Sequence, residues 1–179
     1  MALTATIYSL KIDLSDMDRG VFETLDLRIA RQPSETIENM LMRVLAYCME
    51  YQDGIFLTEG VAAGNEPAIL VRDLTGKTMA WIEVGMPDAA RLHRGMKLAG
   101  RAAVYTHRDV RRLLAQFLAA DIFKAETIPV YAIDPTFIND FSALIDRRSE
   151  LSISITDREL FLSIGDRNLM TTVVVHRIE

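Results

Sequence analysis

The α/β fold of this chain follows from two apolar runs, PAILVR at residues 67–72 and MAWIEV at residues 79–84. A polar turn containing a glycine, residues 73–77, separates them. Short runs rich in branched and aromatic residues, bounded by turn residues, predict strands. Because the turn between them is short, the two strands are expected to be antiparallel neighbours. They form the centre from which the rest of the fold is built.

Helices and strands alternate on the C-terminal side of this pair. Apolar residues recur at helical spacing in residues 87–98 and 109–122, whereas residues 102–105 and 128–133 are typical of short strands. A short helix is expected near residues 135–145. Alternating side chains then predict three strands in the tail, at residues 151–155, 160–164 and 169–177.

The N-terminal part adds two longer strands and a helix. Residues 3–14 and 20–31 alternate between apolar and polar side chains across a polar turn, so we expect an antiparallel pair. A helix opens at residues 32–35, because proline and glutamate are both favoured in a first turn. We therefore predict a single α/β domain over residues 1–179. It has a mixed β-sheet flanked by helices, with additional N- and C-terminal antiparallel strands.

Composition excludes several classes of protein. Of 179 residues, 50% are hydrophobic and 25% are charged, which is typical of a folded globular chain. Charged residues interrupt every apolar run before it reaches the roughly 18 residues of a membrane-spanning helix. The first residues lack a signal-peptide pattern, and the single cysteine, Cys48, excludes an internal disulfide framework and a CxxC metal site. We expect a cytoplasmic protein that does not bind a membrane.

Basic residues are concentrated in one part of an acidic chain. The net charge is −5, but residues 91–120 contain seven bases and one acid, a local charge of +6 that leaves −11 elsewhere. One interpretation is that these bases form the solvated outer faces of two helices. The other is a phosphate-facing patch, in which the nucleic-acid-binding residues are Arg91, Arg94, Arg111 and Arg112.

Three glutamates occur where a carboxylate is unusual. On a helical wheel Glu38 falls within the flank of its helix's apolar stripe, where a rim or arginine-paired carboxylate is the alternative to a functional one. Glu83 ends a strand with apolar neighbours, and an acid there is costly unless it is paired or metal-bound. Glu66 lies at the entrance of the preceding strand and faces either the same cleft or solvent. Converging carboxylates suit Mg²⁺ or Mn²⁺.

Four short stretches carry a resemblance to a known family. They are GVFETL at residues 20–25, PSETIE at 33–38, EP at 66–67 and WIEVGMPD at 81–88. Through these stretches the chain resembles the bacterial YaeQ family, and the resemblance extends along nearly its full length. The helix glutamate followed by two strands also resembles the PD-(D/E)XK restriction-endonuclease-like superfamily. This resemblance implies a nuclease-like α/β fold, with Glu38 matching the helix glutamate and Glu83 the acid of the second strand.

Two positions depart from the nuclease pattern. The aspartate that usually follows the proline falls on Ala68, so Glu66 on the other side of the proline would have to replace it. The usual lysine falls on Gly85, which removes a cation that positions water or stabilises the transition state. Lys97 is a candidate for a relocated lysine, and His93 is a second candidate.

Two functions from different classes follow. The first is a divalent-metal-dependent phosphodiesterase acting on nucleic acid, with Mg²⁺ or Mn²⁺ as cofactor. Its metal ligands would be Glu38, Glu66 and Glu83, and its catalytic residues these three together with Lys97. The alternative is a non-catalytic protein with a nuclease fold that binds nucleic acid or a protein partner. The two departures favour the alternative, whereas the retained carboxylates favour the enzyme.

Overall fold

The computed structural model describes residues 3–59 and 64–179, which form two compact units. Unit 1 comprises the described residues up to 41 together with residues 133–173, and unit 2 comprises those between 42 and 132 together with residues 174–179. Each unit contains one mixed β-sheet. The predicted mixed α/β architecture is therefore confirmed, but the strands divide between two sheets instead of forming one.

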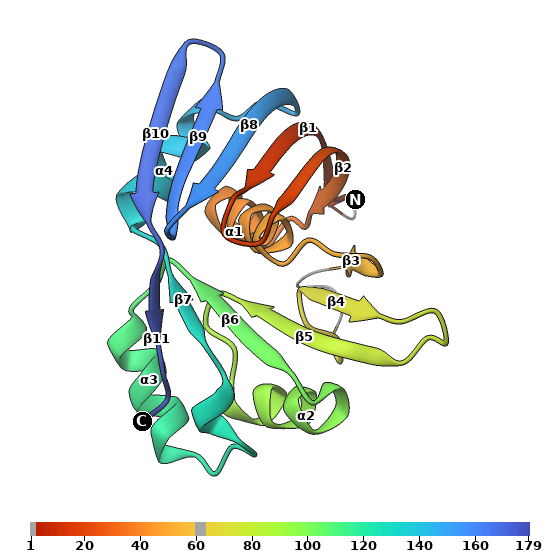
Figure 1. Ribbon diagram of the computed structural model, residues 1–179, viewed down its shortest axis with the longest axis vertical. Helices are drawn as coiled ribbons and strands as arrows, with labels where there is room; N and C mark the ends of the chain where they lie inside the picture. The colour runs from red at the N-terminus through yellow and green to blue at the C-terminus, as the bar shows by residue number, and fades with distance from the viewer. Residues whose placement is uncertain (1–2, 60–63) are drawn as a thin grey trace. The chain divides into compact units, whose positions relative to one another are not determined.

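Unit 1 is built on a five-stranded sheet, here called sheet A, with strand order β10-β9-β8-β1-β2 (Figure 1). Only the contact between β1 and β8 is parallel within this sheet. Buried and exposed side chains alternate along β1, so one face of the sheet is in the core and the other is exposed. α4 lies against β10. The elements are β1 (Thr6–Asp16), β2 (Val21–Arg31), α4 (Pro135–Leu144), β8 (Arg148–Thr156), β9 (Glu159–Ile164) and β10 (Arg167–Thr172).

The parallel pairing of β1 with β8 corrects one expectation. β1 and β2 form the predicted antiparallel pair, but the N- and C-terminal strands share sheet A instead of adding to one mixed sheet, and Ile12 of β1 lies opposite Leu151 of the parallel strand β8. Such a contact joins segments far apart in sequence. Local alternation of side chains predicts each strand but carries no information about a partner at that separation.

Unit 2 is built on a six-stranded sheet, sheet B, with strand order β11-β7-β6-β5-β4-β3. β4 and β5 are antiparallel neighbours as predicted, with Leu70 opposite Trp81. β5, β6 and β7 are parallel to one another, and the three-residue strand β3 was not predicted. The strands are β3 (Ile55–Leu57), β4 (Ile69–Arg72), β5 (Thr78–Val84), β6 (Ala102–Thr106), β7 (Val130–Ala132) and β11 (Val174–His176).

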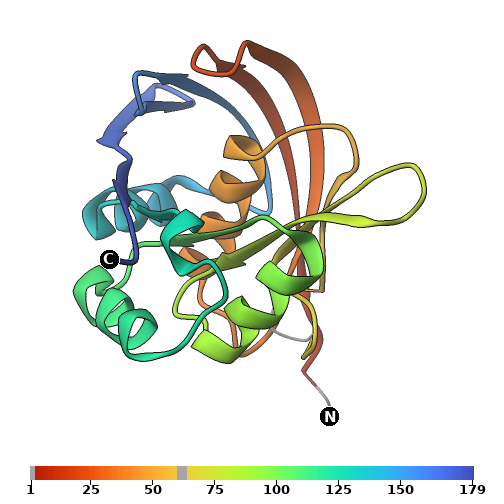
Figure 2. The ribbon, with the colours of Figure 1, turned by 60° about the horizontal axis from the view of Figure 1, so that its bottom comes forward.

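Two helices of unit 2, α2 (Ala89–Ala99) and α3 (Val110–Ala119), cover one face of sheet B (Figure 2), and a short 3₁₀ turn, η2 (Ala125–Thr127), follows α3. Both begin after an aspartate whose side chain accepts a backbone N–H of the first turn, Asp88 in α2 and Asp109 in α3. These caps place the helix starts slightly later than predicted. Gly100, with φ of 74°, ends α2 in the left-handed conformation that glycine adopts most easily.

The long helix α1 (Ile37–Met49) begins later than the sequence predicted. The hydroxyl of Thr36 accepts the backbone N–H of Asn39, so Thr36 is the N-cap, and the expected start at residues 32–35 is wrong. The first residues of α1, to Leu41, belong to unit 1 and the remainder to unit 2. In the described residues, no helix is both long enough and apolar enough to cross a membrane.

The predicted tail strand at residues 169–177 is in fact two strands. β10 ends at Thr172 in sheet A, and β11 begins at Val174 in sheet B. Between them Val173 is buried and its N–H donates to the carbonyl of Arg158 at 2.8 Å. The alternating pattern of residues 169–177 therefore continues across the change from sheet A to sheet B.

Candidate functional site

A buried carboxylate, Glu83, lies near the end of β5 on the side of sheet B that carries α2. Its side chain is 5% exposed. Trp81, two residues earlier and therefore on the same face of the strand, donates its indole N–H to Glu83 Oε1 at 2.9 Å. Arg91, in the first turn of α2, donates from Nε to the same oxygen at 3.1 Å. The predicted position of Glu83 beside Trp81 is thus confirmed, and an arginine completes the site.

The environment of Glu83 has two opposing effects on the pKa of its carboxyl group. Burial raises the pKa of the carboxyl, because the charged form loses its hydration. The positive charge of Arg91 and the hydrogen bonds from Trp81 and Arg91 lower it in part, and the net direction remains upward. Arg91 therefore favours the charged form of the buried Glu83 carboxylate.

Arg91 joins three parts of unit 2. Besides Glu83, its guanidinium donates to the backbone carbonyl of Gly64 at 3.1 Å and to that of Glu66. All of these bonds use the fixed fork of the guanidinium. The Asp88 cap sets the start of α2 and so places Arg91 in its first turn, facing the end of β5. The arginine therefore fixes the segment that enters β4 against the end of β5.

The side chain of Glu66 does not take part in these bonds. Its Oε1 lies 4.0 Å from Arg72, and both side chains are almost half exposed. An exposed pair at this separation contributes little stability. Glu66 thus contributes its backbone, and not its carboxylate, to the contacts around Arg91.

The two bases proposed to replace the missing lysine lie on α2. Lys97 is exposed in the last turn of the helix. It is six residues beyond Arg91, about 9 Å further along the axis and about 120° around it. His93 accepts the backbone N–H of Phe123 on its Nδ1 at 3.1 Å, which is a structural contact. Arg91 is the base that the structure brings to Glu83.

Glu38 is half-buried in the first turn of α1, in the part of that helix that belongs to unit 1. Its expected place in one pocket with Glu66 and Glu83 of unit 2 stays a prediction. A nearby acid that the sequence did not single out, Glu35, is buried at 3% exposure and accepts the side-chain amide of Asn39 at 2.8 Å.

The predicted divalent-metal site stays a prediction, and the arrangement of the described donor groups decides whether a metal ion would fit there. Across residues 3–59 and 64–179, no three His, Cys, Asp or Glu side chains are grouped so as to hold a metal ion. Glu83 is bound to a guanidinium, and the carboxylate of Glu66 lies beside Arg72. In this arrangement the residues do not fit Mg²⁺ or Mn²⁺, which require several oxygen ligands around one point.

A second buried acid in unit 2 was missed by the sequence reasoning. Glu50, which directly follows α1, is 4% exposed. It accepts the hydroxyl of Tyr105 at 2.7 Å and the guanidinium of Arg101 at 2.6 Å. The ring of Tyr105 stacks on Tyr131 at 4.6 Å between centroids. Burial, and next the charge of Glu50, raise the pKa of Tyr105 well above its usual value, so its hydroxyl remains a donor.

Replacing Tyr105 with phenylalanine is expected to lower the free energy of unfolding by about 1 to 2 kcal/mol, because Glu50 loses a donor where water does not reach it. Urea titration followed by circular dichroism measures the change. Tyr8→Phe is the matched control: Tyr8 is also buried, and the described residues offer its hydroxyl no hydrogen bond. Equal stability of the two variants would contradict the prediction.

The other predicted basic residues lie on the outer sides of α2 and α3. Arg94, Lys97, Arg111 and Arg112 are all exposed, whereas the buried residues of these helices, such as Leu92 and Phe117, face sheet B. Arg91 differs from them because its guanidinium is turned toward Glu83 and its side chain is only 26% exposed. These four exposed residues, which have no ion-pair partner among the described residues, are here called the basic face.

Fold and site together define a class of mixed α/β proteins with two mixed sheets and a buried glutamate–arginine pair at a strand end. The chain belongs to the YaeQ family, because the model of the family described as "YaeQ protein" matches residues 1–173. This match includes most of both units. The predicted family membership is confirmed.

Relatives and solved structures agree with this family. The chain is 31% identical over 170 residues to "Uncharacterized protein YaeQ" of Escherichia coli K12, with 94% of each chain covered. The crystal structure of the YaeQ protein from Pseudomonas syringae superposes with a TM-score of 0.89 at 27% identity, covering 96% of this chain and 95% of that one. The YaeQ protein from Xanthomonas axonopodis pv. citri gives the same score and identity, covering 97% and 99%.

Proposed function

We propose that this protein binds nucleic acid through the basic face and does not use its carboxylates for cleavage. In this proposal the chain has a restriction-endonuclease-like fold with a degenerate site. The observation that carries it is the ion pair between Glu83 and Arg91. The carboxylate that a nuclease of this class needs for its metal is occupied by a cation of the protein itself.

The stability of that pair supports a structural role for Glu83. Removing Arg91 would leave a buried carboxylate without a counter-charge, which costs several kcal/mol. The guanidinium is also held by two backbone carbonyls, so displacing it from Glu83 Oε1 would break three hydrogen bonds. Gly85, in the place of the usual lysine, also supports a structural role for Glu83.

The basic face provides the chemistry for binding phosphate. Its four cations come from two helices on the same face of sheet B, and none of them forms an ion pair with another described residue. Contacts of lysine and arginine with phosphates supply sequence-independent affinity by releasing counterions. Because the whole chain carries −5, this affinity has to come from the local patch and must weaken steeply with salt.

The test is fluorescence anisotropy with labelled single- and double-stranded DNA and RNA at several salt concentrations. The double variant Arg111→Gln/Arg112→Gln is expected to bind about tenfold more weakly at low salt. The slope of log K against log salt should fall by about 1.4 to 1.8, since each lost phosphate contact contributes roughly 0.7 to 0.9. Arg167→Gln, an exposed arginine on β10 in unit 1, is the matched control. Binding that is absent, or that the double variant leaves unchanged, would refute the proposal.

Nuclease activity is the second candidate, and one observation favours it. Arg91 contacts Glu83 through its carboxylate and Glu66 through its backbone carbonyl, so the segments that carry two of the predicted metal ligands lie beside each other. The wild-type protein is therefore incubated with the same nucleic acids in Mg²⁺ and in Mn²⁺, beside Glu83→Gln. Cleavage that Glu83→Gln abolishes would replace the binding proposal with the enzyme, whereas cleavage that survives it would indicate a contaminant.

A further inference from the structure

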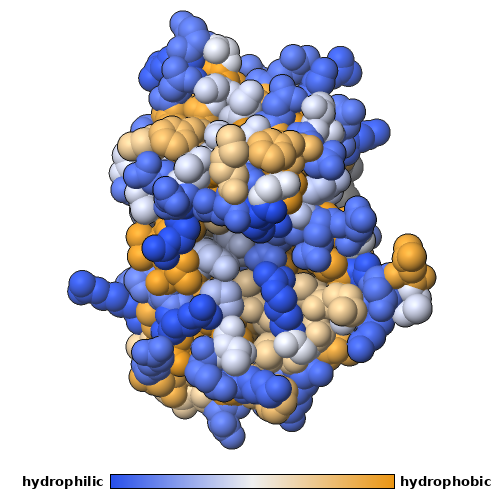
Figure 3. All heavy atoms as spheres, in the orientation of Figure 1, coloured by the Kyte–Doolittle hydropathy of each residue, from blue (hydrophilic) through white to orange (hydrophobic). Residues whose placement is uncertain are grey.

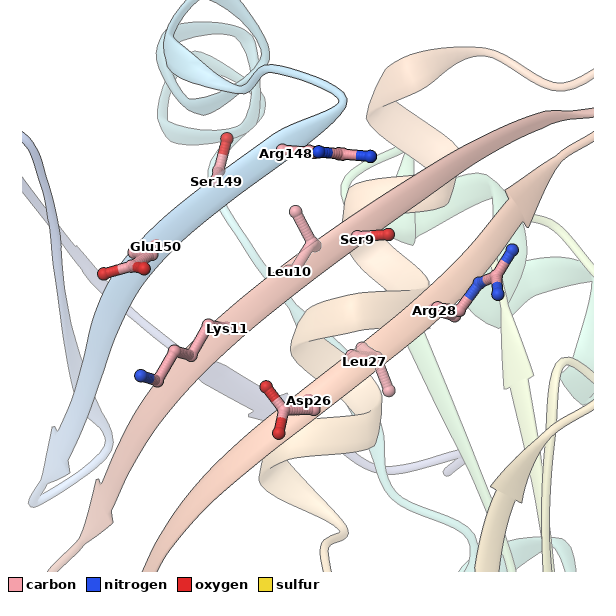
Figure 4. Close-up of a pocket in the computed structure, with 9 residues that line it drawn as sticks. All are labelled: Ser9, Leu10, Lys11, Asp26, Leu27, Arg28, Arg148, Ser149 and Glu150. Atoms are coloured by element: carbon pink, nitrogen blue, oxygen red, sulfur yellow. The ribbon is translucent and has the colours of Figure 1, made fainter.

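A groove crosses the exposed face of sheet A in unit 1, over β2, β1 and β8 (Figure 4). It has a volume of about 540 Å³. All of its charged lining residues come from these three strands, and each is exposed. The charged and hydroxyl groups that matter below are Ser9, Lys11, Asp26, Arg28, Arg148 and Glu150.

Strand register arranges these side chains in two rows. Ser9 of β1 lies opposite Arg28 of β2 and Arg148 of β8. Lys11, two residues further along β1, lies opposite Asp26 and Glu150 in the same way. Because neighbouring strands are about 4.8 Å apart, the Cα atoms of the two arginines are separated by about 10 Å. A small serine between two arginines leaves space above the middle strand.

The two rows differ in charge and direction. The first row carries two positive charges and no negative one, while the second carries one positive and two negative charges. In Figure 4 the side chains of Arg28, Ser9 and Arg148 extend to one side, and those of Lys11, Asp26 and Glu150 extend to the other. Neither arginine side chain has an ion-pair or hydrogen-bond partner among the described residues. The arginine row therefore presents two uncompensated guanidinium groups to one space.

We propose that this groove binds a small phosphorylated molecule, with its phosphate between Arg28 and Arg148. The planar fork of each guanidinium matches two phosphate oxygens, and two such forks from opposite sides neutralise a dianion. The hydroxyl of Ser9, between them, donates a further hydrogen bond. Ser9, Arg28 and Arg148 are thus the phosphate-binding residues.

Size and lining favour a small molecule over a nucleic-acid strand. A volume of about 540 Å³ lies in the range of small-molecule sites. Sheet faces that bind single strands stack the bases on aromatic side chains, and no aromatic side chain lines this groove. This inference does not depend on the basic face, which lies in unit 2.

A neighbouring hollow gives the rest of the ligand a place. It has a volume of about 260 Å³, shares Lys11 and Glu150 with the groove, and adds Asp13, Ser152 and Ser163. Its lining is polar, and hydrophilic side chains also predominate in Figure 3 around the turn that joins β9 and β10. The remainder of the ligand is therefore expected to carry hydroxyl or amino groups, and not a large apolar group.

Isothermal titration calorimetry with pyrophosphate as the probe tests the site. Wild-type protein is expected to bind it, and Arg28→Gln and Arg148→Gln should each weaken binding by about tenfold, since each removes charge-assisted hydrogen bonds. The double variant should show no measurable heat. Arg167→Gln, with its exposed arginine outside the groove, and Arg111→Gln/Arg112→Gln should bind as the wild type does.

Three results would overturn the inference. They are the absence of pyrophosphate binding to wild type, an unchanged affinity in the double variant, and binding of single-stranded DNA at this groove in place of pyrophosphate. Thermal unfolding of each variant checks the fold, and because the replaced residues are exposed, their melting temperatures should match the wild type. Failure of this test with normal salt-dependent nucleic-acid binding would leave the proposed function intact.

Discussion

Arg91→Ala is expected to lower the free energy of unfolding by about 3 kcal/mol at neutral pH. The substitution leaves Glu83 as a buried carboxylate without its counter-charge, and breaking a buried pair in this way typically costs about 3 to 5 kcal/mol. We place the value at the low end because the Arg91 side chain is 26% exposed and its charge is partly screened by solvent. Urea unfolding followed by circular dichroism measures it.

The stability lost in Arg91→Ala should become smaller as the pH falls. Burial already raises the pKa of Glu83 above its unfolded value, and Arg91 counteracts that rise. Without Arg91 the pKa rises further, so the folded variant takes up a proton more readily than its unfolded chain does. The variant therefore recovers stability as the pH falls from neutral toward the unfolded carboxyl pKa of about 4.3, and loses it as the pH rises through the folded value.

Two further variants separate charge from packing. Arg94→Ala, on the exposed side of the same helix, should change stability by less than about 0.5 kcal/mol. Glu83→Gln combined with Arg91→Ala should be more stable at neutral pH than Arg91→Ala alone, because the amide carries no charge to bury. A loss in Arg91→Ala that is the same at every pH, or is not relieved by Glu83→Gln, would show that the arginine acts only through its backbone contacts.

Gly95→Val is the second large effect, expected to lower the free energy of unfolding by about 2 to 3 kcal/mol. Gly95 lies in α2 directly against the indole of Trp81, and a Cβ at this position would overlap the ring atoms. Because Trp81 is buried and bonded to Glu83, the ring cannot move aside without disturbing the site. The overpacking outweighs the higher helix propensity of valine.

Ala90→Val is the matched control for this substitution. Ala90 is an exposed residue of the same helix, so valine there meets only the propensity cost of less than about 0.7 kcal/mol. Trp81 is the single tryptophan of the chain, and its fluorescence reports directly on the ring that Gly95→Val displaces. Unchanged emission together with control-like stability would refute the prediction.

Strands β4 and β5 of sheet B could be predicted from sequence because their signals are local. Two apolar runs around a short turn can pair only as antiparallel neighbours, and β4 and β5 do so. The period of two residues also placed Glu83 and Trp81 on one face, which their hydrogen bond confirms. Where capping decided the boundary, as at Thr36, the preceding proline and glutamate were the weaker signals and the predicted start was wrong.

The partners of the buried acids could not be predicted in the same way. Arg91 belonged to the predicted phosphate patch, yet it is turned inward to Glu83, eight residues away in sequence. Glu50 accepts hydrogen bonds from Arg101, which directly precedes β6, and from Tyr105 of β6, both more than fifty residues further on. A helical or strand period fixes the face on which a residue lies, but a long side chain reaches partners that only the packing of separate elements brings near.

By itself, then, the sequence determined most of the strands and helices, the antiparallel pair β4 and β5 of sheet B, and the family resemblance that the comparisons confirm. Tertiary structure decided the division into two sheets, the parallel contact of β1 with β8, and the pairing of Glu83 with a protein cation. The physical reason is the separation along the chain over which each kind of interaction acts. Side-chain periodicity and capping act within one element, whereas sheet order and the neutralisation of a buried charge depend on groups that folding brings together from distant parts of the chain.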